Sequence, residues 1–284
     1  MAREWDAAGH DGDESGDGRE QRDGRERAET ASERRVLART RWRPWMPMVL
    51  AVAVTVGLLV WTAVALPGLP EEVPVHWGAD GQPTRYEPTS FFSVTQGLLI
   101  AMPMLILVTA VVPLAAQLSG SGGQTSWQRV RKVGVSRGLT AAMGWVSLAV
   151  VLLVSVPMME VLTGATGQMP WWVMPLAVTL LLVGMLPLMS LALRRWMRWA
   201  EDTATELGYR PSQEEAADDR LWTPMGLKND PDDPQVFVNK REGYGVGATI
   251  NIGSRGGRML YRGFIAVFML GIPLLLWIAA AAAR

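Results

Sequence analysis

The side chains best suited to chemistry lie in one short stretch between two apolar segments. His76 and Asp80 can together bind a metal ion or relay a proton. Two such ligands are fewer than the roughly three or four that hold zinc in proteins, so we predict no metal site and no cofactor. Alternatively, both residues stabilise a turn by hydrogen bonds while Trp77 anchors it beside lipid. Both interpretations stay open, and the ligand-binding candidates are His76, Trp77, Asp80 and Arg85.

Glu160 is the one acidic residue inside the long apolar segments. A carboxylate in hydrocarbon is a candidate for function, but near the end of a segment it can equally reach the membrane interface. No Lys or Arg lies within the core of an apolar segment, which disfavours an ion pathway built on paired charges. Glu160 is therefore a candidate intramembrane functional residue.

Enzyme-like patterns are weak in this chain. The one Gly-x-Ser-x-Gly match surrounds Ser136 and lacks a preceding strand, and the two histidines are His10 and His76. The glycines at 243–247 precede a strand-like stretch instead of the helix that would hold a phosphate. The acidic residues at 230–233 lack the spacing of a calcium loop. We predict no catalytic residue and no enzymatic activity.

Five long apolar segments must position these residues. The chain has 284 residues, of which 49% are hydrophobic and 19% charged, and the charges are segregated from the apolar runs. Crossing a bilayer takes about 20 apolar residues. We predict an all-α polytopic membrane protein with transmembrane helices at residues 46–66, 94–118, 138–162, 172–193 and 264–283.

The overall charge and the cysteine count exclude some classes of function. The formal net charge is zero, and the basic residues form no single stripe, so we expect no nucleic-acid partner. The chain has no Cys, which excludes disulfides, thiolate nucleophiles and Cys-based zinc sites.

Lys and Arg are distributed unevenly over the segments that connect the apolar runs. They cluster at residues 34–43, 129–137, 194–198 and 255–262, whereas residues 67–92 and 163–171 contain only Arg85. Translocated loops are poor in basic residues. We therefore predict a cytoplasmic amino terminus and an external carboxyl terminus.

The remaining segments differ in character. We predict a disordered cytoplasmic tail at 1–40 and a four-helix membrane domain at 44–193 with a small extracytoplasmic hairpin in its outer loop. Residues 194–262 are expected to form a cytoplasmic amphipathic helix and a small β-hairpin with strands at 235–239 and 246–252. The fifth transmembrane helix, at 264–283, follows.

The stretch after the first apolar segment resembles a known family. Leu69-Pro70, Val73-Pro74-Val75-His76-Trp77, Gly81-Gln82-Pro83 and Tyr86 are similar to domain of unknown function 1648, which includes Sdp-type immunity proteins. A second stretch, between Trp222 and Asn251, resembles domain of unknown function 5808. The resemblance implies a multi-pass protein of the bacterial plasma membrane, linked to toxin immunity or membrane signalling.

We expect a non-enzymatic protein that acts in envelope sensing, signalling or toxin immunity. Its expected partners are membrane lipid, an extracellular peptide or toxin at the outer loop, and a cytoplasmic regulator at the inner hairpin. The alternative is a small transporter or channel. The prolines within the apolar segments, which kink helices, and Glu160 are the features that favour it.

Overall fold

The computed structural model describes residues 31–78, 81–118, 125–241 and 244–283. The chain divides into two compact units, residues 1–41 and 42–284. In the first unit residues 31–38 are helical, within the region predicted as a disordered tail, since Ala, Glu, Arg and Leu there favour a helix. The rest of that tail, residues 1–30, lies outside the described residues, and so does Asp80.

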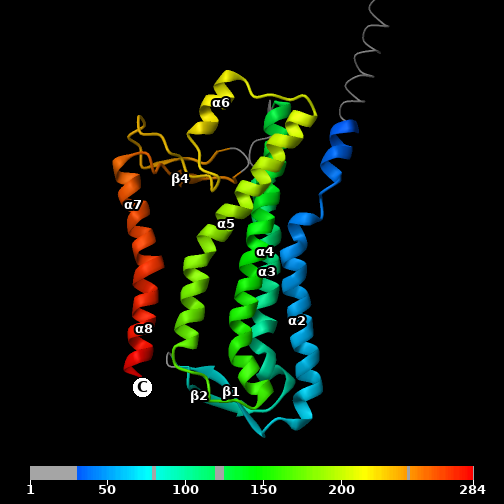
Figure 1. Ribbon diagram of the computed structural model, residues 1–284, viewed down its shortest axis with the longest axis vertical. Coiled ribbons are helices and arrows are strands. Elements are labelled where there is room, and N and C mark those ends of the chain that lie inside the picture. The colour runs from blue at the N-terminus through cyan, green and yellow to red at the C-terminus, as the bar shows by residue number, and fades with distance from the viewer. Residues whose placement is uncertain (1–30, 79–80, 119–124, 242–243, 284) are drawn as a thin grey trace, which may run out of the picture. The chain divides into compact units, whose positions relative to one another are not determined.

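Five helices of the described chain are long and apolar enough to cross a membrane, as the sequence predicts. Figure 1 shows those of the second unit side by side as a bundle. The five helices are α2 (Met46–Ala65), α3 (Phe91–Leu118), α4 (Ser126–Thr163), α5 (Val173–Glu206) and a last helix built from α7 (Arg255–Ile265), η3 (Ala266–Gly271) and α8 (Ile272–Ala282). The last helix is continuous through the π-helical stretch η3.

α4 extends beyond the apolar stretch 138–162 at its amino-terminal end. A capping box starts it: the Thr125 hydroxyl accepts from the Gln128 N–H at 3.2 Å, and the Gln128 side chain accepts from the Thr125 N–H at 3.1 Å. This arrangement satisfies backbone donors that a helix start leaves open. The basic residues at 129–137 therefore lie on a helix and not in a loop.

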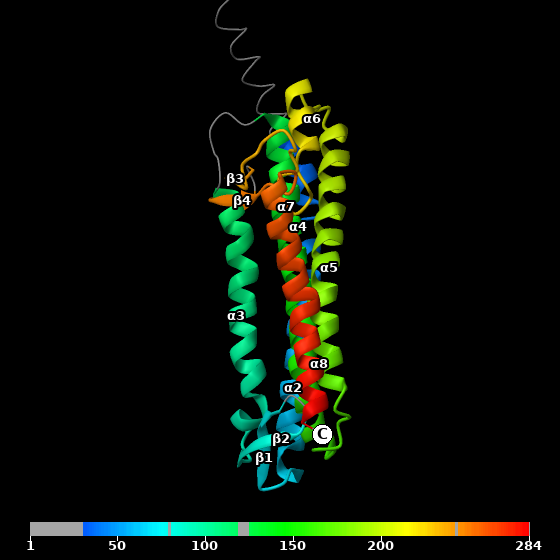
Figure 2. The same ribbon diagram turned by 90° about the vertical axis from the view of Figure 1, so that its left-hand side faces the viewer.

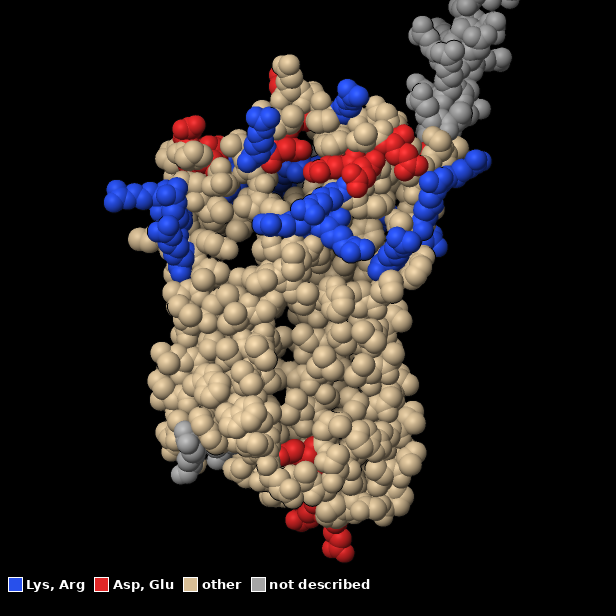
Figure 3. Space-filling view, viewed as in Figure 1, with Lys and Arg blue, Asp and Glu red and all other residues tan. Residues whose placement is uncertain are grey.

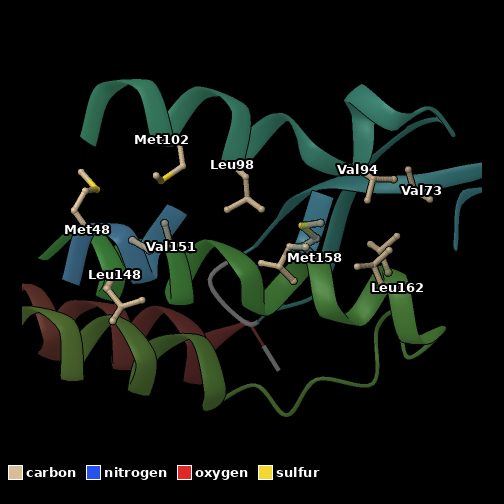
Figure 4. Close-up of a cluster of buried hydrophobic side chains, with 12 residues drawn as sticks. Met48, Val73, Val94, Leu98, Met102, Leu148, Val151, Met158 and Leu162 are labelled. Atoms are coloured by element: carbon tan, nitrogen blue, oxygen red, sulfur yellow. The ribbon is translucent and has the colours of Figure 1, made fainter. Parts of the chain in front are cut away.

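α4 is the central helix of the bundle and packs against α2, α3 and α5. A buried apolar cluster joins α2, α3, α4 and strand β1 (Glu72–Trp77). Figure 4 shows Leu98, Val151 and Val73 within it, and these side chains are 1%, 0% and 1% exposed. Burial of such side chains against one another sets the spacing of the helices through dispersion contacts.

Two glycines let α4 and α5 approach closely. A Cβ at Gly134 would lie 2.5 Å from the Ala200 Cβ and 2.9 Å from the Trp196 carbonyl oxygen. A Cβ at Gly138 would lie 2.8 Å from Leu193 Cδ2. Small residues at such crossings allow backbone-to-backbone packing, which is a main source of helix association in lipid.

Hydroxyl groups buried in the bundle bond mostly to their own helix. Thr55, Thr62 and Thr140 each donate to the carbonyl four residues earlier, at 2.9, 2.9 and 3.0 Å. Contacts between helices also occur: Thr109 Oγ1 lies 3.3 Å from Ser147 Oγ, and Trp277 Nε1 donates to Thr179 Oγ1 at 3.2 Å. The second contact attaches α8 to α5.

Two small antiparallel sheets lie at opposite ends of the bundle, as both views show (Figures 1 and 2). β1 pairs with β2 (Pro83–Pro88), and β3 (Phe237–Asn239) pairs with β4 (Ala248–Ile250). Residues 207–254, here called the polar segment, contain β3, β4 and helix α6 (Gln213–Arg220). Ser212 and Glu215 form the capping box of α6.

Asn251 holds the polar segment together from inside, and its side chain is fully buried. Its amide nitrogen donates to the carbonyls of Asp230 and Asp233 at 2.9 and 2.8 Å. Its amide oxygen accepts from the N–H groups of Asp230 and Gly253, both at 3.0 Å. One side chain thereby replaces the backbone partners that a two-stranded sheet cannot supply.

Charged side chains are confined to the two ends of the bundle. On the face drawn in Figure 3, Lys and Arg gather at the end with the polar segment, and the middle of the bundle shows no charge. The other end shows acidic side chains and no basic ones on that face. This separation is expected of helices that cross hydrocarbon, where a charge is costly.

Gly134→Ala tests the close contact between α4 and α5. The new methyl group meets the backbone of Trp196, so we expect a loss of about 1–3 kcal/mol in stability and a lower melting temperature in detergent. Gly184→Ala is the matched control, because a Cβ there meets nothing within 4 Å. Equal melting temperatures for the two variants would contradict the packing.

Asn251→Ala tests the polar segment. Four hydrogen bonds of the Asn251 side chain are lost, and each unsatisfied backbone group costs about 1–3 kcal/mol, so limited proteolysis should cleave residues 207–254 much faster. The control is Asn239→Ala, at an exposed position of β3. Unchanged protection in Asn251→Ala would show that the segment is stable without this side chain.

Candidate functional site

The β1–β2 sheet carries most of the residues that the sequence singles out. Its register pairs His76 with Arg85 and Trp77 with Pro83. Val73 is buried against the bundle, whereas β2 is exposed along most of its length. The sheet is therefore attached to the bundle through β1 and presents β2 to the surroundings.

Glu160, near the carboxyl end of α4, attaches the sheet to the bundle. It is only 8% exposed. Its Oε2 accepts from Trp77 Nε1 at 3.2 Å, and its Oε1 accepts from the backbone N–H of Met169 at 2.8 Å. One carboxylate thus connects β1, the end of α4 and the segment between α4 and α5. The carboxylate is therefore buried and accepts two hydrogen bonds from within the protein.

His76 and Arg85 lie on the exposed side of the same sheet. The His76 Nδ1 is 2.7 Å from the hydroxyl oxygen of Thr84 across the sheet, a contact that stabilises the strand pair. Arg85 Nη2 lies 3.3 Å from Glu87 Oε1, with side chains 63% and 40% exposed. Exposed pairs of this kind contribute about 0–1 kcal/mol. These residues are accessible to a ligand but are not gathered around a catalytic centre.

An apolar cavity of about 120 Å³ lies beneath the sheet. Trp77 lines it from β1, Leu98 from α3 and Met158 from α4. Among the described residues no group of three or more His, Asp or Glu side chains could hold a metal ion. This end of the molecule offers apolar and aromatic contacts, together with the exposed polar groups of β2.

A second polar constellation lies at the other end of α4, where the sequence indicates no site. Arg131 of α4 pairs with Asp219 of α6, and Arg241, which follows β3, pairs with Asp219 and with Asp218 at 2.9 Å. Thr125 Oγ1 donates to Glu215 Oε1 at 2.7 Å. These contacts fix the polar segment to the start of α4.

Burial shifts the protonation equilibria of this constellation. Desolvation lowers the pKa of Arg241, a change that nearby Asp218 partly offsets. Desolvation also raises the pKa of Tyr244, whose hydroxyl donates to the Pro224 carbonyl at 3.0 Å. The sequence signal for these contacts was the opposite charge of two runs near helix starts. The basic run 129–132 follows the capping box of α4, and the acidic run 214–219 includes Glu215 of the capping box of α6.

Two patterns in the sequence have structural explanations. Ser136 lies inside α4 and is only 6% exposed, so it is not the nucleophile on a strand-to-helix turn that a hydrolase needs. In the acidic stretch 230–233, Lys228 Nζ pairs with Asp230 at 3.0 Å and Asp233 at 2.9 Å. A lysine of the chain itself occupies the position where a cation would bind.

The comparisons with known proteins give one match. The model of a domain of unknown function, DUF1648, matches residues 53–107. These residues span most of α2, both strands of the β1–β2 sheet and the first part of α3, so the resemblance to this domain is confirmed for that region. No curated protein and no solved structure matches the chain. Residues 53–107 are thus similar to a domain to which no activity has been assigned.

Proposed function

We propose that this chain is a multi-pass protein of a bacterial plasma membrane, with its amino terminus in the cytoplasm and the β1–β2 sheet outside. The support is the distribution of charge. Basic clusters precede α2, begin α4, end the apolar part of α5 and begin α7, and the connections at 67–92 and 163–171 contain only Arg85. Cytoplasmic loops carry such an excess of Lys and Arg.

In this proposal the protein is non-enzymatic and acts in envelope sensing, signalling or toxin immunity. The β1–β2 sheet binds an extracytoplasmic peptide or toxin, and the polar segment contacts a cytoplasmic regulator. The observation that carries the proposal is that α4 is bonded at both ends, through Glu160 to Trp77 of the sheet and through Arg131 to Asp219 of the polar segment.

α4 has the length that such a connection requires. Glu160 and Arg131 are separated by about 43 Å along a helix that rises about 1.5 Å per residue, which is close to the full thickness of a bilayer with its headgroups. A ligand that displaces β1 disturbs the contact between Trp77 and Glu160. Because α4 packs on three other helices as one rigid element, its displacement would also change the contact between Arg131 and Asp219.

An extended peptide is the ligand that suits the sheet best. Among the described residues β1 and β2 pair only with each other, so the exposed strand β2 has an outer edge with backbone groups for a third strand. Peptides that add a strand gain main-chain hydrogen bonds and side-chain specificity. Tyr86, which is 51% exposed, and Arg85 supply an aromatic surface and a cation on β2.

The hydrogen bonds of Glu160 support a transporter less well than they support a receptor. Both carboxylate oxygens of Glu160 already accept hydrogen bonds, from Trp77 and Met169. A transport carboxylate must exchange partners with its substrate, and the described residues offer Glu160 no charged partner in an apolar segment.

Glu160→Ala tests the attachment of the sheet to the bundle. The Trp77 and Met169 donors lose their acceptor, at a cost of about 1–3 kcal/mol each, so hydrogen–deuterium exchange should accelerate in residues 72–88 and 165–172. Glu87→Ala is the control, since its pair with Arg85 is exposed. Equal exchange in the two variants would contradict a structural role of Glu160.

A second experiment tests coupling between the ends. Hydrogen–deuterium exchange of residues 213–220 is followed in reconstituted protein as envelope peptide fractions are added. We expect a fraction that protects residues 83–88 also to change exchange in α6, because α4 joins the two regions.

In Glu160→Ala the peptide fraction should still slow exchange of residues 83–88 relative to the same variant without peptide, and the response of α6 should be lost. A response of α6 that persists in this variant would contradict coupling through Glu160. If no fraction protects residues 83–88, the proposal of a peptide ligand fails.

A further inference from the structure

A cavity of about 370 Å³ lies where α4, α6 and the residues after β3 meet. Small-molecule sites commonly enclose about 300–1,000 Å³, so this volume suits a small ligand. Trp127 and Arg131 line it from α4, Glu214 and Asp218 from α6, and Arg241 and Tyr244 from the segment after β3.

Two hydrogen-bond donors of this cavity are buried and have no acceptor among the described residues. They are Nε1 of Trp127 and Nη1 of Arg241. Leaving a buried donor unsatisfied costs stability, and charged donors cost the most. Trp127 and Arg241 line the same cavity, so a single ligand with several acceptor oxygens is a candidate partner for both donors.

The walls are also polarised from inside to outside. The Arg131 and Arg241 side chains are 17% and 14% exposed. The carboxylates at the rim are open to solvent: the Asp218 side chain is 52% exposed, and Glu214 is exposed. The inner carboxylate, Asp219, is already paired with both arginines. Nη1 of Arg241, which has no acceptor among the described residues, and the exposed carboxylates at the rim suit a ligand that places its anionic group inward and an amine outward.

The state of Arg241 supports an inward anion. Its pKa is lowered by desolvation although Asp218 and Asp219 pair with its Nη2, and its Nη1 has no acceptor among the described residues. Guanidinium groups bind the oxygens of phosphate in a fork-like geometry. A phosphate has enough acceptor oxygens to accept from both donors at once.

We propose that this cavity binds a small amine-bearing phosphate, the chemistry shared by free phosphoethanolamine and the headgroup of an ethanolamine phospholipid. The phosphate accepts from Trp127 Nε1 and Arg241 Nη1, and the ammonium group faces Glu214 and Asp218. Both sources are open to this site because the cavity lies at the end of α4 that extends past the apolar stretch 138–162.

Titration calorimetry of the full chain in phosphatidylcholine nanodiscs tests the site, with phosphoethanolamine and methyl phosphate as probes. We expect saturable binding of phosphoethanolamine and weaker binding of methyl phosphate, which lacks the amine. Trp127→Phe removes one donor and keeps an aromatic ring, and it should lower the affinity for both probes roughly tenfold. Trp145→Phe, on an exposed part of the same helix, should change neither.

Glu214→Gln tests the contact with the ammonium group alone. It should lower the affinity for phosphoethanolamine and leave that for methyl phosphate unchanged, since only the first has an ammonium group. Absence of saturable binding, or equal affinities in wild type and Trp127→Phe, would overturn the proposal. An equal loss of affinity for both probes in Glu214→Gln would overturn the assigned orientation.

Nanodiscs that contain phosphatidylethanolamine distinguish the two sources. If the lipid headgroup occupies the cavity, these nanodiscs should weaken the apparent affinity for phosphoethanolamine by competition, and Trp127→Phe should abolish the difference. An affinity that is the same in both lipids, with Trp127 still required, supports a free soluble ligand.

Discussion

The absence of water in hydrocarbon is the constraint on which this structure depends. Every backbone and hydroxyl group in the apolar part of the bundle must find a partner inside the protein. The buried hydroxyls of Thr55, Thr62 and Thr140 therefore bond to their own helices. Apart from the contacts of Thr109 with Ser147 and of Trp277 with Thr179, association of the helices depends on close packing, which Gly134 and Gly138 make possible for α4 and α5.

The same constraint moves specific polar contacts to the two ends of α4. At one end Glu160 accepts from Trp77 and Met169, and at the other Arg131 pairs with Asp219. Partly buried contacts of this kind hold geometry more strongly than an exposed pair such as Arg85 with Glu87. Each end of α4 is thereby fixed to a small folded element that has no independent core, and this arrangement is why we propose communication between the two elements.

The membrane helices could be predicted from sequence because hydrocarbon imposes a length and a composition on each segment. α2, for example, coincides with the predicted segment 46–66 within one residue. The extensions of α4 and α5 follow from ordinary helix signals outside the apolar stretch, such as the Thr125 cap. The contacts of the site could not be predicted. Trp77 and Glu160 are 83 residues apart, Arg131 and Asp219 are 88 apart, and local patterns do not encode such pairings.

The central claim is that the β1–β2 sheet and the polar segment lie on opposite sides of one membrane and are joined by α4. The chain has no cysteine, so single cysteines can be introduced without other changes. We would place one at exposed Tyr86 of β2 and another at exposed Gln213 of α6, and label intact cells with a membrane-impermeant maleimide. The account predicts that Tyr86→Cys is labelled in intact cells and Gln213→Cys only after permeabilisation. Labelling of both positions in intact cells, or of Gln213→Cys alone, would contradict it.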